Sequence, residues 1–404
     1  MSGEAIYRKA VFPMKYIQGA GAISELPALA ALFGDRAFIV ASPSAAREAG
    51  KAFEAALPEG RSVEVFKGEC KDSELERLTD GMKKSGTDVV VGAGGGKTID
   101  SAKIIADRME LPVVVVPTIA STDAPCSGCA VVYDENGTFQ RVEYQKQNPA
   151  AVLVDTAIIA RAPVRYLVAG MGDALSTVFE ARSCIRTHSQ NCCGGYSTLA
   201  AIELAELCYS TLKKYGAAAL MACERGVVTQ AVEYIVEANT LLSGVGFESS
   251  GLATAHAVHN GLTALSATHG RLHGEKVAFG TLTGLHLNGE SKELLEDVYC
   301  FCESIGLPTT FEDLGLKDVS CEDLMVAATR TCAQQESIHH EALAVTPEQV
   351  RAEVLTRLKT IGAGGGLIIG PTHHVQLDTP MANFWAMANA ITGTPYTSVR
   401  NGHV

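Results

Sequence analysis

Positive charge is scarce in this chain, which has 33 Lys and Arg residues against 45 Asp and Glu residues and a formal net charge of −12. An acidic protein is repelled by polyanions, which argues against nucleic acid as a partner. No apolar run reaches the roughly 18 residues that a membrane span needs. The N-terminal stretch MSGEAIYRKAVFPMKY also lacks the basic and then apolar pattern of a secretory signal. We therefore expect a cytoplasmic protein that binds neither nucleic acid nor membranes.

The cysteines do not form a zinc-ribbon pattern. Of the 12 cysteines, Cys126 and Cys129 have C-x-x-C spacing, but a zinc ribbon needs a second such pair and the sequence has none. In a cytosolic protein, cysteines scattered through apolar segments are mostly reduced and buried. We interpret Cys126 and Cys129 as two thiols beside a strand.

What the chain does have is length for two or three domains and a change of pattern along its 404 residues. Its first part alternates short apolar runs with helical patterns, which is typical of an α/β domain with a parallel sheet. Parallel strands that are buried on both faces are continuous apolar runs. Such runs occur at 36–41, 88–92, 112–117 and 151–155.

From about residue 163 the pattern becomes helical. Alanine- and leucine-rich segments such as 197–214 and 228–242 end in glycines or prolines, and strand-like runs become scarce. We predict an α/β nucleotide-binding domain at 1–162 with a parallel, Rossmann-like sheet, an all-helical domain at 163–350, and an atypical tail at 351–404.

A glycine-rich loop follows the second apolar run, in the stretch VVVGAGGGKTID at 89–100. A strand, glycines and a helix in this order bring free backbone N–H groups and the positive end of a helix dipole to one point, which suits a phosphate. The Walker A pattern fails at Val91 and the Rossmann glycine pattern fails at Lys97. We interpret Gly94, Gly95 and Gly96 as amides that approach a pyrophosphate, with Lys97 adding charge. A tight turn without a ligand is the alternative.

The third apolar run leads into PTIASTDAPCS at 117–127. In doubly wound sheets, ligands bind at the carboxyl ends of the strands. Residues 118–127 offer four hydroxyl groups and one carboxylate, Asp123, at such an end. These groups suit a ribose, a nicotinamide amide or a polyol, and a polar turn with local capping is the alternative.

Two histidines and a carboxylate in the helical half are candidate metal ligands. Asp173, His256 and His273 would form an open three-ligand site for Zn²⁺ or Fe²⁺, with a fourth position left for a substrate oxygen. His259 follows His256 by three residues and His269 precedes His273 by four, so either pair would share a helix face. Spacing alone does not choose among these histidines, and a satisfied core histidine is the alternative.

Five motifs in a fixed order carry a family resemblance from the N-terminus to about residue 350. They are GGGKTID (94–100), PTIASTDAPCS (117–127), LVAGMGDALS (167–176), EANTLLSGVGFESSGLATAHAVHNGLT (237–263) and HGEKVAFGTLT (273–283). With them the chain resembles the bacterial glycerol dehydrogenases, members of the iron-containing (group III) alcohol dehydrogenase superfamily, which also includes dehydroquinate synthase.

The resemblance implies an NAD-linked oxidation of glycerol to dihydroxyacetone with a catalytic zinc, in a homo-oligomer that is frequently an octamer in this family. It places the metal on Asp173, His256 and His273, and glycerol against Asp123 and His256. It places the nicotinamide cofactor on Gly94, Gly95, Gly96, Lys97, Thr118, Ser121, Ser127, Cys129, Val131 and Tyr133.

The implied chemistry has a physical basis. The metal acts as a Lewis acid on the substrate hydroxyl, and the nicotinamide takes the hydride. Asp123 would accept a hydrogen bond from a neighbouring hydroxyl, which favours vicinal diols over plain alcohols. No general base is evident, so the proton is expected to leave through water or through His259 or His269. A site between the two domains would exclude water.

Three positions depart from the family pattern. Ser42 stands where the NAD enzymes of the family carry an aspartate that holds the adenosine ribose. The loss of that charge weakens the preference for NAD over NADP and leaves the choice open. Cys129 replaces a usual leucine and Ser250 a usual glycine. We expect neither of these two to abolish activity.

The tail has a different resemblance. Residues 350–391 resemble the C-terminal end of uroporphyrinogen decarboxylase and related corrinoid methyltransferases. Those enzymes are TIM barrels, and about 40 residues cannot close a barrel of about 250. We therefore expect the tail to lack that activity and to be an appendage, an interaction segment or an accident of gene fusion.

Two other functions compete with the dehydrogenase. A lyase of the dehydroquinate synthase type uses the same cofactor and metal, but it needs basic residues for a phosphate or phosphonate, and 117–127 contains an acid and no base. A non-enzymatic scaffold that presents the tail would leave the glycine loop and the candidate metal ligands without a role.

Overall fold

The computed structural model describes residues 7–56 and 62–352, which belong to one compact unit. The segment that resembles uroporphyrinogen decarboxylase lies almost wholly outside the described residues. The boundary predicted at 162 falls inside this unit, and both predicted boundaries, at 162 and at 350, stay predictions.

Six parallel strands form one sheet in the order β1-β8-β5-β4-β2-β3. Their bounds are β1 Tyr16–Gly19, β2 Ala37–Ala41, β3 Ser62–Val65, β4 Val89–Gly94, β5 Val113–Pro117 and β8 Ala151–Asp155. The four strands β2, β4, β5 and β8 are buried along their whole length and coincide with the four apolar runs. They need no polar alternation, because neither face of the sheet meets water.

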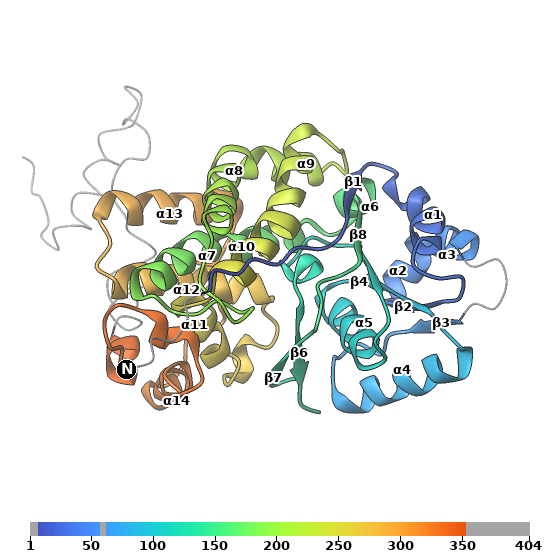
Figure 1. Ribbon diagram of the computed structural model, residues 1–404. Coiled ribbons are helices and arrows are strands. Elements are labelled where there is room, and N and C mark those ends of the chain that lie inside the picture. Colours follow the sequence, from blue (N-terminus) through green and yellow to red (C-terminus); the bar gives the residue numbers. More distant parts are fainter. Residues whose placement is uncertain (1–6, 57–61, 353–404) are drawn as a thin grey trace, which may run out of the picture. The chain divides into compact units, whose positions relative to one another are not determined.

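Helices cover both faces of the sheet (Figure 1). Helices α1 (Leu26–Ala31), α2 (Pro43–Glu48) and α3 (Gly50–Ala56) pack on one face around a core that includes Ile39 and Val91. Helices α4 (Asp72–Ser85) and α5 (Gly96–Arg108) cover the other face. Gly92 makes the approach of α5 close, since a Cβ there would lie 2.6 Å from the Ala102 Cβ. An antiparallel hairpin of β6 (Cys129–Tyr133) and β7 (Phe139–Tyr144) stands apart from the sheet and contacts α5.

The second half of the described chain is helical. Its α-helices are α6 Thr156–Arg161, α7 Val164–Thr187, α8 Leu199–Cys223, α9 Gln230–Glu237, α10 Ser243–Ser250, α11 Thr254–Leu262, α12 His273–Leu287, α13 Lys292–Ile305 and α14 Cys321–Thr331. A π-helical turn, η3, spans Ala238–Leu242, and 3-10 turns occupy η1 Ala22–Glu25, η2 Ala124–Cys126, η4 Ser266–Thr268 and η5 Ser337–His340. Helix α12 packs against both α7 and α11. The predicted fold class, an α/β domain followed by helices, is confirmed.

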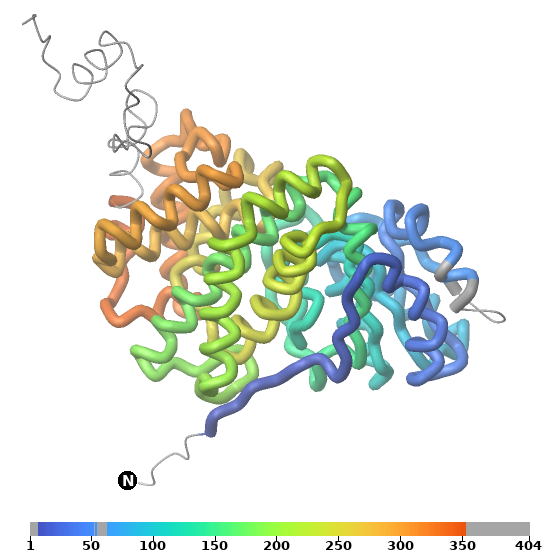
Figure 2. Tube along the Cα trace, turned by 90° about the horizontal axis from the view of Figure 1, so that it is seen from above, coloured from blue at the N-terminus to red at the C-terminus, as the bar shows by residue number. Residues whose placement is uncertain are grey.

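The segment before β1 joins the two halves, and Figure 2 shows it running along the helices before it enters the sheet. The backbone N–H of Lys9 donates to the Tyr196 carbonyl (3.0 Å). The backbone N–H of Val11 donates to Ser249 Oγ (3.1 Å). The first described residues thus hold the sheet to the helical half.

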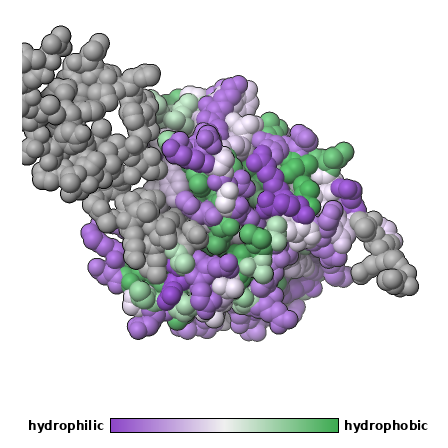
Figure 3. Space-filling view, turned by 90° about the vertical axis from the view of Figure 1, so that its left-hand side faces the viewer, coloured by the Kyte–Doolittle hydropathy of each residue, from purple (hydrophilic) through white to green (hydrophobic). Residues whose placement is uncertain are grey.

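The surface is mixed in character. The face shown in Figure 3 carries hydrophilic and hydrophobic residues side by side. Of the helices within the described ranges, none combines the length and the apolar character that crossing a bilayer requires.

Candidate metal centre and cofactor loops

Three candidate metal ligands come together from three helices. Asp173 lies within α7 and is fully buried, His256 lies on α11, and His273 is the first residue of α12. One ligand atom from each residue can be chosen so that all three lie within 4.8 Å of one another. Asp173 Oδ1 is 3.1 Å from His273 Nε2 and 3.6 Å from His256 Nε2.

The other two histidines lie outside this group. His259 Nε2 is 3.0 Å from His273 Nδ1, and His269 Nε2 is 3.1 Å from the Thr263 carbonyl. Both rings therefore already have partners inside the protein. A role for either of them in moving the substrate proton stays a prediction.

The three residues fit a divalent metal ion. Asp173 Oδ1 is buried without a hydrogen bond of good geometry, although two imidazole nitrogens lie close to it. This arrangement is expected when lone pairs point at a common centre rather than at one another. Two imidazoles and one carboxylate are also donors that Zn²⁺ and Fe²⁺ accept.

A second carboxylate orients His256. Glu180 Oε2 accepts a hydrogen bond from His256 Nδ1 (2.7 Å), and Glu180 Oε1 accepts from the backbone N–H groups of Ala253 (2.8 Å) and His256 (3.0 Å). A proton held on Nδ1 leaves Nε2 free to face Asp173. Sequence reasoning missed Glu180. The sequence did contain a sign of it: Glu180 follows Asp173 by seven residues, which puts both carboxylates on one face of α7.

A polar chain orients His273. Its Nδ1 faces His259 Nε2, and His259 Nδ1 donates to Asn260 Oδ1 (3.1 Å). The amide nitrogen of Asn260 donates to Glu336 Oε2 (2.8 Å). Because Asn260 Oδ1 accepts the proton of His259 Nδ1, the Nε2 atom of His259 is unprotonated. It can therefore accept a hydrogen bond from His273 Nδ1. The other nitrogen of His273 is thereby left for a metal.

Glycines allow the helices that carry these residues to cross closely. A Cβ on Gly274 would lie 1.8 Å from the Ala169 carbonyl oxygen, and one on Gly172 would lie 2.5 Å from the Gly274 carbonyl oxygen. A Cβ on Gly280 would lie 2.3 Å from the Ala255 carbonyl oxygen. Two of these glycines adjoin candidate ligands in the sequence, namely Gly172 beside Asp173 and Gly274 beside His273. The short distances at the centre thus depend on residues without side chains.

Burial and charge shift the pKa values at this centre. Burial raises the pKa of Asp123 well above its usual value, and the nearby Asp173 charge adds to that shift. Burial alone would also raise the pKa of Asp173, but His273 and His256 lower it. Burial lowers the pKa of His256, but Glu180 and Asp173 raise it by more, so that this pKa lies well above its usual value. Several buried carboxylates therefore share this space, and a dication would supply the positive charge that balances them.

We expect Glu180→Gln to weaken zinc binding by about 10- to 100-fold, because the amide has one acceptor oxygen where the carboxylate serves three N–H donors with two, so the hydrogen bond that orients His256 Nδ1 is weakened. Competition with a zinc-binding dye measures this affinity. Glu206→Gln is the matched control, since Glu206 pairs with Arg182 at the surface and lies outside the centre. Unchanged zinc affinity in Glu180→Gln would contradict the assigned role.

The glycine loop lies where two strands of the sheet end. Strand β4 ends at Gly94, Gly95 precedes the first turn of α5, and no side chain caps that turn. A Cβ on Gly95 would lie 2.8 Å from Ile119 Cδ1, so the loop contacts the segment that follows β5. Lys97 Nζ donates to Glu69 Oε2 (2.6 Å) and lies 4.8 Å from the centre of the Tyr133 ring. The first turn of α5 therefore has no side-chain cap, while Lys97 is already paired.

The segment after β5 reaches the candidate metal centre. Thr118, Ser121 and Ser127 are buried. The backbone N–H of Asp123 donates to Asp173 Oδ2 (3.2 Å), and Ser243 Oγ donates to Asp123 Oδ2 (2.9 Å). This segment therefore contacts the glycine loop at one place and the metal centre at another.

Three of the predicted cofactor residues share one face of β6. Cys129, Val131 and Tyr133 are partly exposed, and the residues between them are buried. Alternate residues of a strand face the same way, so these three side chains are neighbours. Cys126 and Cys129 are free thiols.

Ser42 adjoins the glycine loop. It caps α2 by accepting the backbone N–H of Ala45 (3.1 Å). A Cβ on Gly94 would lie 3.0 Å from the Ser42 side chain. The position is therefore close to the predicted pyrophosphate site, and it carries no charge.

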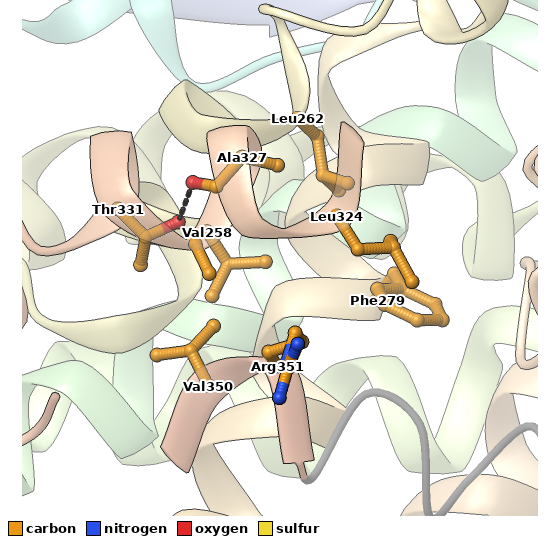
Figure 4. A pocket seen from close by; sticks show the side chains of 9 residues that line it. Val258, Leu262, Phe279, Leu324, Ala327, Thr331, Val350 and Arg351 are labelled. Carbon is orange, nitrogen blue, oxygen red and sulfur yellow. Dashed lines mark hydrogen bonds between the residues drawn. The ribbon is translucent and has the colours of Figure 1, made fainter. Parts of the chain in front are cut away.

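A small apolar cavity lies elsewhere, between α11, α12, α14 and the helical turn at 347–352 (Figure 4). Its lining is almost entirely aliphatic or aromatic, with Thr331 bonded to the Ala327 carbonyl (3.0 Å) and Arg351 at one side. Among the described residues, its lining offers no set of metal ligands or catalytic groups.

Comparisons with known proteins agree with this geometry. The family described as iron-containing alcohol dehydrogenase matches residues 13–156. Glycerol dehydrogenase of Thermotoga maritima is 52% identical over 342 residues, which cover 84% of this chain and 94% of that protein. Glycerol dehydrogenase of Citrobacter freundii is 49% identical over 347 residues, with coverage of 85% and 95%.

A solved structure agrees as well. The crystal structure of a probable glycerol dehydrogenase from Sinorhizobium meliloti 1021 has a TM-score of 0.84 and 43% identity, and the match covers 87% of this chain and 98% of that one. The resemblance found in the motifs is thus confirmed, and the chain belongs to the iron-containing alcohol dehydrogenase family.

Proposed function

We propose that this chain is a metal-dependent oxidoreductase that transfers a hydride from glycerol, or a similar vicinal diol, to NAD and so forms dihydroxyacetone. The placement of Asp123 carries the proposal. Its backbone bonds to Asp173, and it belongs to the segment that contacts the glycine loop. A diol held there would lie between metal and cofactor, as hydride transfer requires. The high identity to glycerol dehydrogenases supports the same substrate.

The metal would be held by Asp173, His256 and His273. When bound, a divalent ion supplies the Lewis-acid chemistry that polarises the substrate hydroxyl. We propose Zn²⁺, with Fe²⁺ as the alternative for the same donors. Glu180 and His259 keep the two imidazoles oriented for this ion.

Asp123 would select the diol. Ser243 Oγ donates to its Oδ2, and Ser243 is in turn hydrogen-bonded to Thr177 Oγ1 (2.9 Å). The carboxylate is therefore held in one orientation, and its other oxygen can accept a hydrogen bond from a second hydroxyl. A plain alcohol leaves that buried acceptor without a partner, which costs free energy.

The nicotinamide cofactor would bind along the ends of β4 and β5. The amides of Gly94, Gly95 and Gly96 would receive its pyrophosphate. The side chains on β6 would lie beside the rest of the cofactor. NAD is proposed, and NADP is the alternative because Ser42 provides no carboxylate to repel a 2′-phosphate.

Formation of reduced nicotinamide tests the proposal. The full chain, loaded with Zn²⁺, would be given NAD or NADP with glycerol, 1,2-propanediol or 1-propanol. We expect turnover with the two vicinal diols, loss of turnover after chelation, and recovery when Zn²⁺ is returned. Absence of turnover with every small diol, in both directions and with either cofactor, would overturn the proposal.

We expect Ser243→Ala to lower the preference for glycerol over 1-propanol by about 5- to 20-fold, because Asp123 loses the bond that orients it. The ratio of the two kcat/KM values measures this. Ser210→Ala is the matched control, since the Ser210 hydroxyl donates to the Leu207 carbonyl of its own helix at the surface. An unchanged ratio in Ser243→Ala would remove Ser243 from the specificity machinery.

We also infer a homo-oligomer, as the family resemblance implies. The segment before β1 exposes Tyr7, Phe12 and Met14, which are apolar side chains that a second copy would cover. Light scattering on the full chain would show a mass above the 42.5 kDa of one copy. A monomer at micromolar concentration would refute the inference.

A further inference from the structure

A lysine is buried beneath the segment that follows Asp123. Lys103 lies on α5, and only 1% of it is exposed. Its Nζ donates to the carbonyls of Ala124 (3.0 Å), Ser127 (3.3 Å) and Cys129, and it is 3.4 Å from Ser127 Oγ. An ammonium has three protons, so these oxygens share them. A single side chain thereby ties down three carbonyls within six residues of backbone.

Within the described residues, Lys103 forms one ion pair. Asp100, one helical turn earlier on α5, places Oδ1 3.1 Å from Lys103 Nζ. Its Oδ2 accepts the backbone N–H of Val131 (3.0 Å). Burial lowers the pKa of Lys103, but the acidic groups around it, Asp100 foremost, together raise that pKa above its usual value. Both members of the pair hold the backbone at or just before β6.

The opposite side of the same segment is also anchored. Glu248 Oε1, from α10, accepts the backbone N–H of Gly128 (2.8 Å). Glu248 Oε2 accepts from the Asn148 amide (2.6 Å), which also donates to the Cys126 carbonyl (3.0 Å). The segment 124–129 is thus held by its carbonyls from α5 and by an N–H from the helical half. Lys103 thereby contacts Ser127 and Cys129, two of the proposed cofactor residues, from the side of α5.

We propose that Lys103 is a positioning residue which sets the backbone of residues 124–131 so that Ser127, Cys129 and Val131 can receive the nicotinamide cofactor. This inference rests on the proposed function. Lys103 also lies on α5, the helix that begins at the glycine loop. It therefore links the proposed pyrophosphate site at that loop to the proposed nicotinamide site at residues 124–131. An ordinary stabilising ion pair would not need three carbonyls from the cofactor segment.

The test compares Lys103→Met with the wild type, both as the full, zinc-loaded chain. Methionine keeps most of the length of the side chain but leaves three buried carbonyls without their donor. Titration with NADH, followed by its fluorescence, should give a Kd raised by about tenfold or more. Bound zinc should be unchanged, because its candidate ligands come from α7, α11 and α12. Hydrogen exchange should become faster in the peptide covering 119–133.

Two further variants make the test specific. Lys103→Gln keeps two N–H donors without charge, so its Kd for NADH should lie between those of the wild type and Lys103→Met. If Lys103→Met does not fold, Lys103→Gln takes its place in the test. Lys213→Met is the matched control, because Lys213 also pairs with an aspartate and a carbonyl, those of Asp297, far from the cofactor segment. Its NADH affinity should equal that of the wild type.

The outcomes separate the two proposals. Folded Lys103 variants with a Kd within about twofold of the wild type would overturn the positioning role. Failure of the wild type to bind NADH would instead overturn the proposed function. The exchange rates in 119–133 would still show whether Lys103 holds this segment.

Discussion

Replacing Asp173 by alanine is expected to lower kcat/KM for glycerol by about a thousandfold or more, because the Lewis acid supplies several kcal/mol of the stabilisation of developing charge. The Asp173 carboxylate is fully buried, and its Oδ1 lies 3.1 Å from His273 Nε2 and 3.6 Å from His256 Nε2. Steady-state kinetics and metal analysis of the same preparation measure the effect.

The same variant should lose the stabilisation that zinc provides. A ligand that binds only the folded state raises the free energy of unfolding in proportion to the logarithm of its concentration over Kd. Tm of the wild type should therefore rise with added Zn²⁺, and Tm of Asp173→Ala should not. Asp297→Ala is the matched control, because Asp297 pairs with Lys213 in the helical half, outside the centre. Stoichiometric zinc and more than a tenth of the activity in Asp173→Ala would disprove the assignment.

Replacing Gly274 by alanine is expected to destabilise the protein by about 3 kcal/mol or more and to remove the bound metal. The added Cβ would lie 1.8 Å from the Ala169 carbonyl oxygen and 2.9 Å from the Asp173 backbone nitrogen. These are backbone atoms of α7, which cannot move aside as a flexible side chain would. The two helices must therefore separate, and His273 then moves away from Asp173.

Gly270→Ala provides a close control, since a Cβ at Gly270 meets nothing within 4 Å. It lies only four residues before Gly274 in the same chain segment. Urea unfolding and zinc content should be close to those of the wild type in Gly270→Ala, and both should fall in Gly274→Ala. A Gly274→Ala protein with normal stability and full zinc would show that the helix crossing does not govern the site.

The central strands could be predicted because their environment is uniform. The strands β2, β4, β5 and β8 are buried on both faces, so each is a continuous apolar run in the sequence. Strand β1, at one edge, is only half-buried and left no such run. The hairpin of β6 and β7 was also not predicted, since it lies apart from the sheet and has a mixed pattern.

The candidate site was predictable in its parts and not in its assembly. The glycine loop and the hydroxyl-rich segment were evident because each depends on residues that are adjacent in the chain. Spacing left His256 and His259 as equal alternatives on α11. The structure distinguishes them, because Glu180 orients His256 toward Asp173 whereas His259 turns its ring to His273. That distinction depends on a residue 76 positions away from His256.

The sequence by itself determined the local features of this protein: four buried strands, a glycine-rich loop between a strand and a helix, a polar segment at a strand end, and helices after residue 163. Only the tertiary structure decided which of these features meet. Asp123 contacts Asp173 across 50 residues, and Lys103 reaches the Ala124 carbonyl from α5. These contacts depend on how closely helices cross and which way buried side chains turn. Glycines determine how closely the helices cross, and partners distant in the chain determine how the buried side chains are oriented. No local sequence pattern contains this information.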